Sequence, residues 1–292
     1  VFTFEVRRRE IPLLLANGRI SARSFPRYQR FSWFFRPVLQ HFNGLGMQSK
    51  TDLERIRAIG APRERSTVLG NLKYDIPFSP VADVERLQLR QAYRIPADVA
   101  VFCIGSTHPG EEELILAVYQ GLLKQFDHLL LVLVPRHPER TAEVASLISG
   151  LGLDLVRRSE LDQLTGNCCP GTVLLIDTVG ELMQLYALAD LAYVGGSLVP
   201  TGGHNLLEPA SRGIPILFGP HMDNFQEITA LTLEYGAGVQ VADQQELLDA
   251  AADFLATPEL RHVVGSNGLK LLRDSGGAVE HHLAMLGEVM TQ

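Results

Sequence analysis

Short apolar runs of strand length alternate with helical patterns along most of this 292-residue chain. From residue 99 on, the sequence predicts strands at 99–104, 129–134, 153–156, 172–176, 191–194, 214–218 and 238–241. Helical patterns at 111–126, 139–149, 181–189, 205–212 and 225–235 connect them, and three more close the chain at 245–255, 259–272 and 279–290. Parallel strands that are buried on both faces read as continuous apolar runs. The alternation therefore predicts an α/β fold with a doubly wound sheet.

The earlier part of the chain shows the same alternation on a smaller scale. A strand-like stretch and an Arg run follow Val1, and further strands are predicted at 11–17, 43–48 and 67–70. The two prolines of DIPFSP at residues 75–80 disfavour helix and indicate a linker. We expect domains at residues 1–76 and 77–292, with the last helix packing back toward the first domain. Neither an initiator Met nor a signal-peptide pattern opens the chain, so we expect the first domain to be incomplete.

Charge and aromatic residues are unevenly distributed. Residues 1–80 hold 14 Lys/Arg against 6 Asp/Glu, a net charge of +8, whereas the remainder holds 12 against 27, or -15. Arginines and aromatics interleave in residues 24–42, which suits a membrane surface or a phosphorylated lipid acceptor. The alternative is an amphipathic helix packed in the core with a solvated Arg face. The acidic remainder argues against nucleic acid as a partner.

Cysteine content and hydropathy exclude two further classes of protein. The three cysteines, Cys103, Cys168 and Cys169, form neither a disulfide framework nor a zinc motif, which favours a reducing compartment. The longest apolar run, residues 129–135, is much shorter than a membrane-spanning helix needs.

The segments that follow the predicted strands carry the chemistry, because ligands of open parallel sheets bind beyond the carboxyl ends of the strands. GSTHPGE at residues 105–111 offers a glycine turn, two hydroxyls and His108 before a helix, which suits an anion. In PRHPER at residues 135–140, Arg136 can stack on a base or bind an anion. Each loop can equally be ordinary turn and capping chemistry, as can GPHMDNF at residues 219–225.

The strongest local signal is GGSLVPTGGHNLLEP at residues 195–209. Its four glycines allow close backbone approach, and a helix beginning near His204 or Asn205 would point its free amides at a phosphate. Glu208 lies three residues after Asn205, where its carboxylate can accept bonds from two ribose hydroxyls. The alternative for Glu208 is a first-turn acid stabilised by the helix dipole.

Several other sites are excluded by their missing motifs. No GxGxxG follows the first strand of the second domain, and no Lys completes a P-loop, so hydride transfer and NTP hydrolysis are disfavoured. The histidines His108, His137, His204 and His221 are dispersed over four loops without helical pairing, so we expect no metal and no cofactor.

Taken together, these segments resemble the 3-deoxy-D-manno-octulosonic acid (Kdo) transferases. The resemblance rests on the glycine loop, GSTHPGE, PRH, DTVGEL at 177–182, GPHMDNF, NGRISARS at 17–24 and GNLKYD at 70–75. It covers nearly the whole chain, and residues 18 and 20 depart from the usual pattern conservatively. It implies a GT-B fold of two Rossmann-like domains, metal-independent inverting transfer of Kdo from CMP-Kdo to a lipid A precursor, and a place at the cytoplasmic face of the bacterial inner membrane in lipopolysaccharide biosynthesis. In this family the membrane anchor and the glutamate that acts as general base precede the segments quoted, so we expect this chain to bind nucleotide and to transfer poorly by itself.

The resemblance also assigns residues. Pro135 and Arg136 would flank the cytidine, Val179, Gly180 and Glu181 would contact the nucleotide through backbone and side chains, and Lys73 would stabilise charge on the leaving CMP. The ribose and phosphate would be held by Asn205, Leu206, Leu207 and Glu208. Further candidates for substrate contact are Ser106, Gly196, Ser197, Gly203, His204 and Arg19. Two alternatives remain: a GT-B enzyme that uses a UDP-sugar, either a transferase or a UDP-GlcNAc 2-epimerase, and a non-catalytic nucleotide-binding module.

Overall fold

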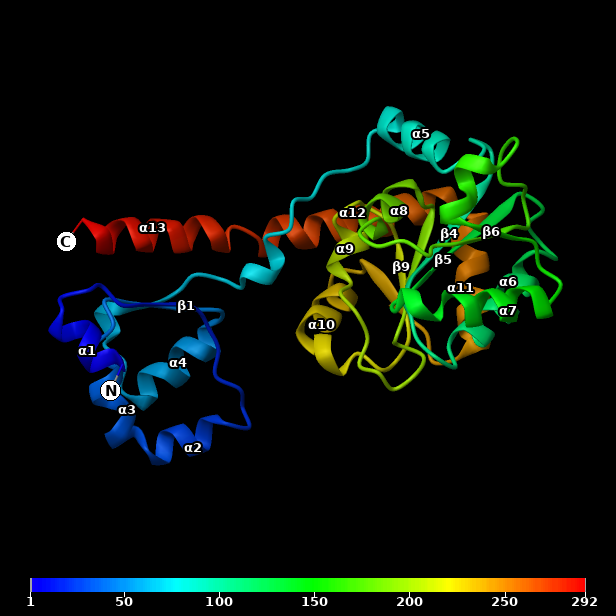
Figure 1. Ribbon diagram of the computed structural model, residues 1–292. Coiled ribbons are helices and arrows are strands. Elements are labelled where there is room, and N and C mark those ends of the chain that lie inside the picture. Colours follow the sequence, from blue (N-terminus) through cyan, green and yellow to red (C-terminus); the bar gives the residue numbers. More distant parts are fainter. Residues whose placement is uncertain (1, 292) are drawn as a thin grey trace. The chain divides into compact units, whose positions relative to one another are not determined.

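A computed structural model describes residues 2–291, and the chain forms two compact units (Figure 1). The first contains the residues up to Ile76 together with those from Arg273 on, and the second spans Pro77–Leu272. The division after Ile76 falls in the segment where the two prolines indicate a linker.

The first unit is built on a three-stranded parallel sheet in the order β1-β2-β3. Its strands are β1 (Leu14–Gly18), β2 (Gly44–Met47) and β3 (Ser66–Val68). Its helices are α1 (Phe2–Arg8), α2 (Phe25–Arg30), α3 (Ser32–Leu39), α4 (Lys50–Ile59) and α13 (Ala278–Met290), with short 3-10 turns η1 (Arg63–Arg65) and η2 (Leu72–Tyr74). Leu45 and Met47 of β2 are fully buried at its centre.

The helix α13 belongs to the first unit although it ends the chain. It packs against β2 and η2. Asp75 accepts hydrogen bonds from the amides of Gly277 and Val279 at the start of α13, and His282 accepts one from the amide of Asn17 at 2.9 Å. These bonds join the final helix to β1 and to the segment after η2.

The strand-like stretch expected after Val1 is wrong, because residues Phe2–Arg8 form α1. Glu5 accepts hydrogen bonds from Arg8 and Arg9, three and four residues later. Such spacing supports a helix, and alternation over only four residues is too short to specify a strand.

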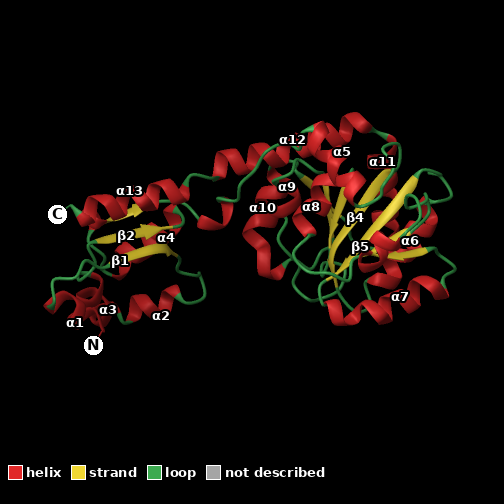
Figure 2. Cartoon of the chain, turned by 45° about the horizontal axis from the view of Figure 1, so that its top comes forward, coloured by secondary structure: helices red, strands yellow, loops and turns green. Residues whose placement is uncertain are grey.

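The second unit is a seven-stranded parallel sheet in the order β10-β9-β8-β4-β5-β7-β6. Its strands are β4 (Ala100–Thr107), β5 (Leu129–Pro135), β6 (Leu155–Arg157), β7 (Val173–Leu175), β8 (Leu191–Val194), β9 (Ile216–Phe218) and β10 (Gly238–Gln240). Its helices are α5 (Asp83–Ala92), α6 (Glu112–Leu122), α7 (Thr141–Gly150), α8 (Leu182–Leu188), α9 (Leu207–Ala210), α10 (Gln226–Glu234), α11 (Gln244–Ala256) and α12 (Pro258–Ser275), with 3-10 turns η3 (Pro138–Arg140), η4 (Arg158–Gln163) and η5 (Asp223–Phe225). Helices cover both faces of this sheet (Figure 2).

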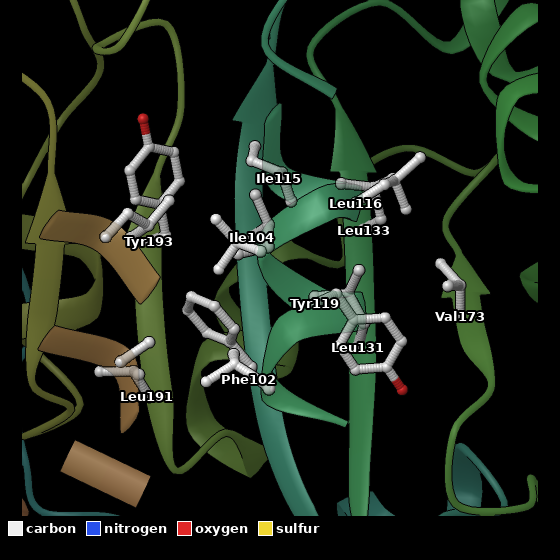
Figure 3. Close-up of a cluster of buried hydrophobic side chains, with 14 of the residues drawn as sticks. Phe102, Ile104, Ile115, Leu116, Tyr119, Leu131, Leu133, Val173, Leu191 and Tyr193 are labelled. Carbon is white, nitrogen blue, oxygen red and sulfur yellow. The ribbon is translucent and has the colours of Figure 1, made fainter. Parts of the chain in front are cut away.

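Two apolar clusters lie on the two faces of the large sheet. Phe102 and Leu131 pack with α6, α7 and α11 on one face (Figure 3), and Val101 and Val132 pack with α8 on the other. Successive strand residues point to opposite faces, so both faces of β4 and β5 are dry. The large sheet is therefore a buried layer between two sets of helices, and the loops after its strands lie at its carboxyl edge.

The helix α5 has no counterpart in the sequence pattern, which predicts no element between the linker and residue 99. Polar contacts hold it: Arg86 and Arg90 both donate to the carboxylate of Asp190, at 2.6 and 2.7 Å. Arg90 is buried and also donates to the carbonyls of Ala97 and Val99. Leu89 is packed against the core, but most other anchors of α5 are ion pairs and hydrogen bonds of its arginines, so apolar periodicity does not reveal it.

Candidate functional site

The centre of the large sheet contains its topological switch point, where β4 lies between β5 and β8. The chain passes from β4 toward β5 on one side and later returns to β8 on the other. Open α/β sheets bind ligands in the crevice at this point, beyond the carboxyl ends of the strands. The loops that follow β4, β5 and β8 carry His108, Arg136 and His204, so the predicted segments meet where a ligand is expected.

A buried carboxylate of the protein bonds the backbone amides of residues 196–198, in the first half of the glycine loop at residues 195–209. Glu111, which is fully buried, accepts hydrogen bonds from the amides of Gly196, Ser197 and Leu198 at 2.7, 3.1 and 3.0 Å. The hydroxyl of Tyr193 donates to the same carboxylate at 2.8 Å. These amides are therefore already bonded within the protein.

Ser197 is likewise part of the internal network. Its buried hydroxyl donates to the carbonyl of Val194 at 2.6 Å and accepts from the amide of Gly219 at 2.7 Å. The contact links the loop after β8 to the loop after β9. Ser197 thus shapes the glycine loop from inside, and its hydroxyl is not directed at a ligand.

The helix expected at residues 205–212 is shorter than predicted. The helix α9 begins at Leu207 and has four residues, and the side chain of Asn205 accepts a hydrogen bond from the amide of Leu207 at 3.1 Å. Asn205 thus precedes the helix and bonds to its first turn. A single helical turn has only a small macrodipole. Charged side chains would therefore have to provide most of the electrostatic attraction for a phosphate.

The side chain of Glu208, in α9, is partly buried. Burial raises the pKa of Glu208, while a hydrogen bond from Asn205 and the charge of Arg136 act in the opposite direction. Leu206 and Leu207 are fully buried and anchor this turn in the core. A carboxylate that is penalised by burial gains from additional hydrogen-bond donors such as ribose hydroxyls.

Arg136 follows β5 at the carboxyl edge of the large sheet. Pro135 ends β5 and is buried, whereas Arg136 is exposed, and its amide donates to the carbonyl of Thr107 at 3.0 Å. The charge of Arg136 lowers the pKa of His108, of His204 and of Glu208. Ser106 lies beside it in a bulge at the end of β4, with a φ of 62°.

In the segment after β7, the backbone at Val179 and Gly180 is more accessible than the carboxylate of Glu181. Val179 is 82% exposed and Gly180 has a φ of 91°. Glu181, however, accepts hydrogen bonds from Tyr93 and Thr178 at 2.5 Å and from Arg158 at 2.8 Å. Burial alone would raise the pKa of Glu181, but these hydrogen bonds lower it. The Glu181 side chain is thus engaged internally, which leaves the backbone of this loop to meet a ligand.

Three of the four histidines that the sequence disperses over separate loops come together. The Nε2 atoms of His108 and His204 are 2.8 Å apart, with ring planes only 15° from parallel, and the ring of His137 lies 5.9 Å from that of His108. Burial lowers the pKa of His108 and also lowers that of His204 to about 4, to which the neighbouring His108 and Arg136 contribute. Sequence spacing gives no sign of this cluster. Within residues 2–291, no group of three or more His, Cys, Asp or Glu side chains could hold a metal ion.

Two candidate residues, Arg19 and Lys73, belong to the first unit. Arg19 follows β1 and is exposed. The candidates Gly196 and Gly203 belong to the second unit. Lys73 lies in η2, where its amide donates to the side chain of Asn71 at 3.1 Å.

The basic aromatic segment at residues 24–42 forms two helices, α2 and α3, rather than one. Neither helix contains a fully buried residue. Phe25 and Phe35 pack against the core of the first unit, whereas four other aromatics are exposed: Tyr28, Phe31, Trp33 and Phe34. The two interpretations of this segment therefore apply to different side chains. No helix in the described part of the chain is long and apolar enough to cross a membrane.

Residues 1–76 match the family described as 3-deoxy-D-manno-octulosonic-acid transferase (kdotransferase). The chain is 35% identical over 279 residues to a 3-deoxy-D-manno-octulosonic acid transferase of Haemophilus influenzae, covering 95% of this chain and 64% of that protein. A protein of the same name from Chlamydia muridarum is 32% identical over 268 residues, covering 91% of this chain and 60% of its own length. The chain thus spans somewhat less than two thirds of these relatives.

Solved structures extend the comparison. The C-terminal CMP-Kdo binding domain of WaaA from Acinetobacter baumannii is 36% identical, with a TM-score of 0.59, and the match covers 65% of this chain and 96% of that domain. Anabaena HepE, solved with UDP, is 16% identical with a TM-score of 0.55 over the whole of this chain and 75% of its own, a likeness in fold alone. The fold is GT-B, with two Rossmann-like α/β units. The chain belongs to the 3-deoxy-D-manno-octulosonic acid (Kdo) transferase family.

Proposed function

We propose that this chain carries the donor-binding domain and part of the acceptor-binding domain of an enzyme that transfers Kdo from CMP-Kdo to a lipid A precursor. One observation carries the proposal. His108, Arg136, His204 and Glu208 gather over the switch point of a domain that is 36% identical to a CMP-Kdo binding domain.

The donor is proposed to lie across the carboxyl edge of the large sheet. Pro135 and Arg136 flank the cytidine, and the backbone at Val179, Gly180 and Glu181 contacts the nucleotide. The residues from Asn205 to Glu208 bind the ribose, with the Glu208 carboxylate as acceptor for its hydroxyls. The partial burial of Glu208 beside Arg136 supports this role, because a carboxylate in such a place benefits from further donors.

The chemistry requires positive charge near the phosphate. When the bond between the anomeric carbon and the phosphate oxygen breaks, its electron pair stays on the phosphate, whose charge grows from one to two. The sugar becomes oxocarbenium-like as the acceptor oxygen bonds to it, and the proton of the acceptor hydroxyl passes to the general base, the glutamate that the family resemblance implies. Arg136 and the imidazoles of His108 and His204 are the groups of the second unit proposed to stabilise this charge, and Lys73 of the first unit is proposed to assist them.

The acceptor and the membrane are proposed to meet the first unit. The exposed aromatics Tyr28, Phe31, Trp33 and Phe34 are interspersed with the exposed Arg23, Arg27 and Arg30 on α2, α3 and the turn before them. A phosphorylated acyl glycolipid offers anionic and apolar groups together, which such a surface can bind. We therefore propose that the protein works at the cytoplasmic face of the inner membrane, in lipopolysaccharide biosynthesis.

The proposal is tested by incubating the longer enzyme proposed to contain this chain, with its general base, together with CMP-Kdo and a lipid A precursor, and analysing the lipid by mass spectrometry. We expect Kdo to be added, and to be added equally well after chelation with EDTA, because guanidinium and imidazole groups serve the phosphate. A product obtained with a UDP-sugar but not with CMP-Kdo would instead indicate another GT-B enzyme. Dependence on a divalent ion would contradict the metal-independent mechanism.

A further inference from the structure

The imidazoles of His108 and His204 join the two loops that flank the switch point. His108 follows β4 and His204 lies in the loop after β8, and their Nε2 atoms are 2.8 Å apart. The ring centroids are 5.1 Å apart with nearly parallel planes, which is the arrangement of an end-to-end N–H···N hydrogen bond rather than of a face-to-face stack.

We propose that this histidine pair takes up one proton when a doubly charged phosphate binds in the crevice, so that the pair responds to the charge on the donor's phosphate. The inference rests on the proposed nucleotide donor and adds a regulation of that same subsite.

The geometry limits the pair to a single added proton. An imidazole–imidazole bond needs one Nε2 that carries hydrogen and one that does not. Both Nδ1 atoms can be protonated without breaking the bond, which gives the pair a charge of +1. A second added proton would put hydrogen on both Nε2 atoms, so the pair holds a charge of zero or +1 as long as the bond persists.

The surroundings favour the neutral pair in the free protein. Burial lowers the pKa of both rings, and the positive charge of Arg136 and the ring of His137 act in the same direction. Glu111 and Glu112 act against this on His108. Both acids are already bonded, Glu111 to the glycine-loop amides and Glu112 to Arg140 at 2.7 Å, so neither is left as a dedicated partner for an imidazolium.

The backbone of Gly196 lies close against both rings. A Cβ built on Gly196 would lie 3.0 Å from Cδ2 of His108 and 3.2 Å from Cδ2 of His204. Gly196 also has a φ of 66°, a conformation that glycine adopts without strain. The part of the loop that Glu111 bonds therefore lies directly against both rings, where only a glycine leaves space for them.

A bound phosphate would supply the negative charge that a protonated histidine pair needs beside it. An anion beside the rings raises the pKa of the pair, and two charges raise it more than one. The donor's phosphodiester has one charge and the CMP product has two near neutral pH. The pair should therefore become protonated as the leaving group departs, with the proton coming from solvent.

The proposal is tested by isothermal titration calorimetry on the whole chain at about pH 7.5, where a phosphate monoester is almost fully ionised. Titrations with CMP and with cytidine are run in two buffers of different ionisation enthalpy, which together give the number of protons exchanged. We expect CMP binding to take up between about half a proton and one proton, and cytidine binding to take up none. The double variant His108→Gln/His204→Gln keeps two side-chain amides that can bond end to end but cannot be protonated, and it should bind CMP without proton uptake. His128→Gln alters an exposed histidine at the opposite edge of the sheet and should behave as the parent does.

Each outcome is decisive. CMP binding without proton uptake in the parent, or undiminished uptake in the double variant, overturns the proposal. If the double variant does not fold, the parent's pH dependence decides instead: CMP affinity should rise up to about tenfold from pH 8 to pH 7, and a flat profile would overturn the inference. Failure of the folded parent to bind CMP at all would contradict the CMP-Kdo donor itself, which separates the two failures.

Discussion

The carboxylate of Glu111 accepts a hydrogen bond of 2.7 Å from the amide of Gly196, 85 residues away in the sequence. This bond and its two neighbours make the glycine loop part of the core rather than an empty cradle. The carboxylate occupies the place where an anion would otherwise sit.

We predict that Glu111→Gln destabilises the second unit by about 2–4 kcal/mol, because one oxygen that accepts amide bonds is replaced by a donor in a buried site. Unfolding in urea should be followed by circular dichroism, since the single Trp33 lies in the first unit. Glu113→Gln, which alters an exposed acid two residues further along α6, is the matched control. Equal unfolding midpoints for the two variants would show that the Glu111 network contributes little.

Replacing Glu208 by Ala should weaken CMP binding by about 1–3 kcal/mol, the usual loss for charge-assisted hydrogen bonds. The parent should bind 2′-deoxy-CMP more weakly than CMP, because the Glu208 carboxylate loses one hydroxyl partner. The Glu208→Ala variant should bind CMP and 2′-deoxy-CMP equally. Glu259→Ala, at an exposed site in α12, should change neither affinity. Unchanged CMP affinity in a folded Glu208→Ala protein would reduce Glu208 to an acid that only stabilises the first turn of α9.

The partly buried His204 should make the protein sensitive to mild acid. The pKa of His204 is lowered from 6.5 to about 4 in the folded protein. Between these two pH values, His204 is protonated in the unfolded chain and neutral in the folded chain. The free energy of unfolding should fall from pH 6.5 toward pH 4, and this fall should be shallower for His204→Gln than for the parent or for His128→Gln. Parallel profiles for all three proteins would mean that His204 titrates normally.

The surface of α2 and α3 should bind anionic bilayers. Each arginine near such a bilayer contributes about 1 kcal/mol, so replacing Arg23, Arg27 and Arg30 by Ser should weaken liposome binding about a hundredfold. CMP affinity should remain unchanged, because the nucleotide is proposed to bind the other unit. If the triple variant sediments with anionic liposomes as the parent does, these arginines are only a solvated surface.

The positions of the strands could be predicted from the sequence because burial on both faces leaves a continuous apolar run, as in residues 129–134. The loops after the strands followed from the same topology. Shorter elements were less predictable. The helix α5 depends on Asp190, and α9 is cut to one turn by the glycines before it and Gly213 after it.

The internal chemistry of the site was not predictable from the sequence. Glycines and a helix start indicate an anion site, but whether a ligand or a side chain supplies the anion depends on contacts between distant residues such as Glu111 and Gly196. For the same reason, the hydrogen bond between His108 and His204 spans 96 positions and follows no periodicity. The roles proposed for Pro135, Arg136, Val179, Gly180 and Lys73 stay predictions.

The identity of the nucleotide base is the most direct test of the account. Isothermal titration of the chain with CMP, UMP and UDP should show CMP binding at least about tenfold more tightly than UMP, because a site that bonds the amino group of cytosine leaves its acceptor unpaired with uracil. UMP or UDP binding as tightly as CMP, with the protein folded, would contradict CMP-Kdo as the donor.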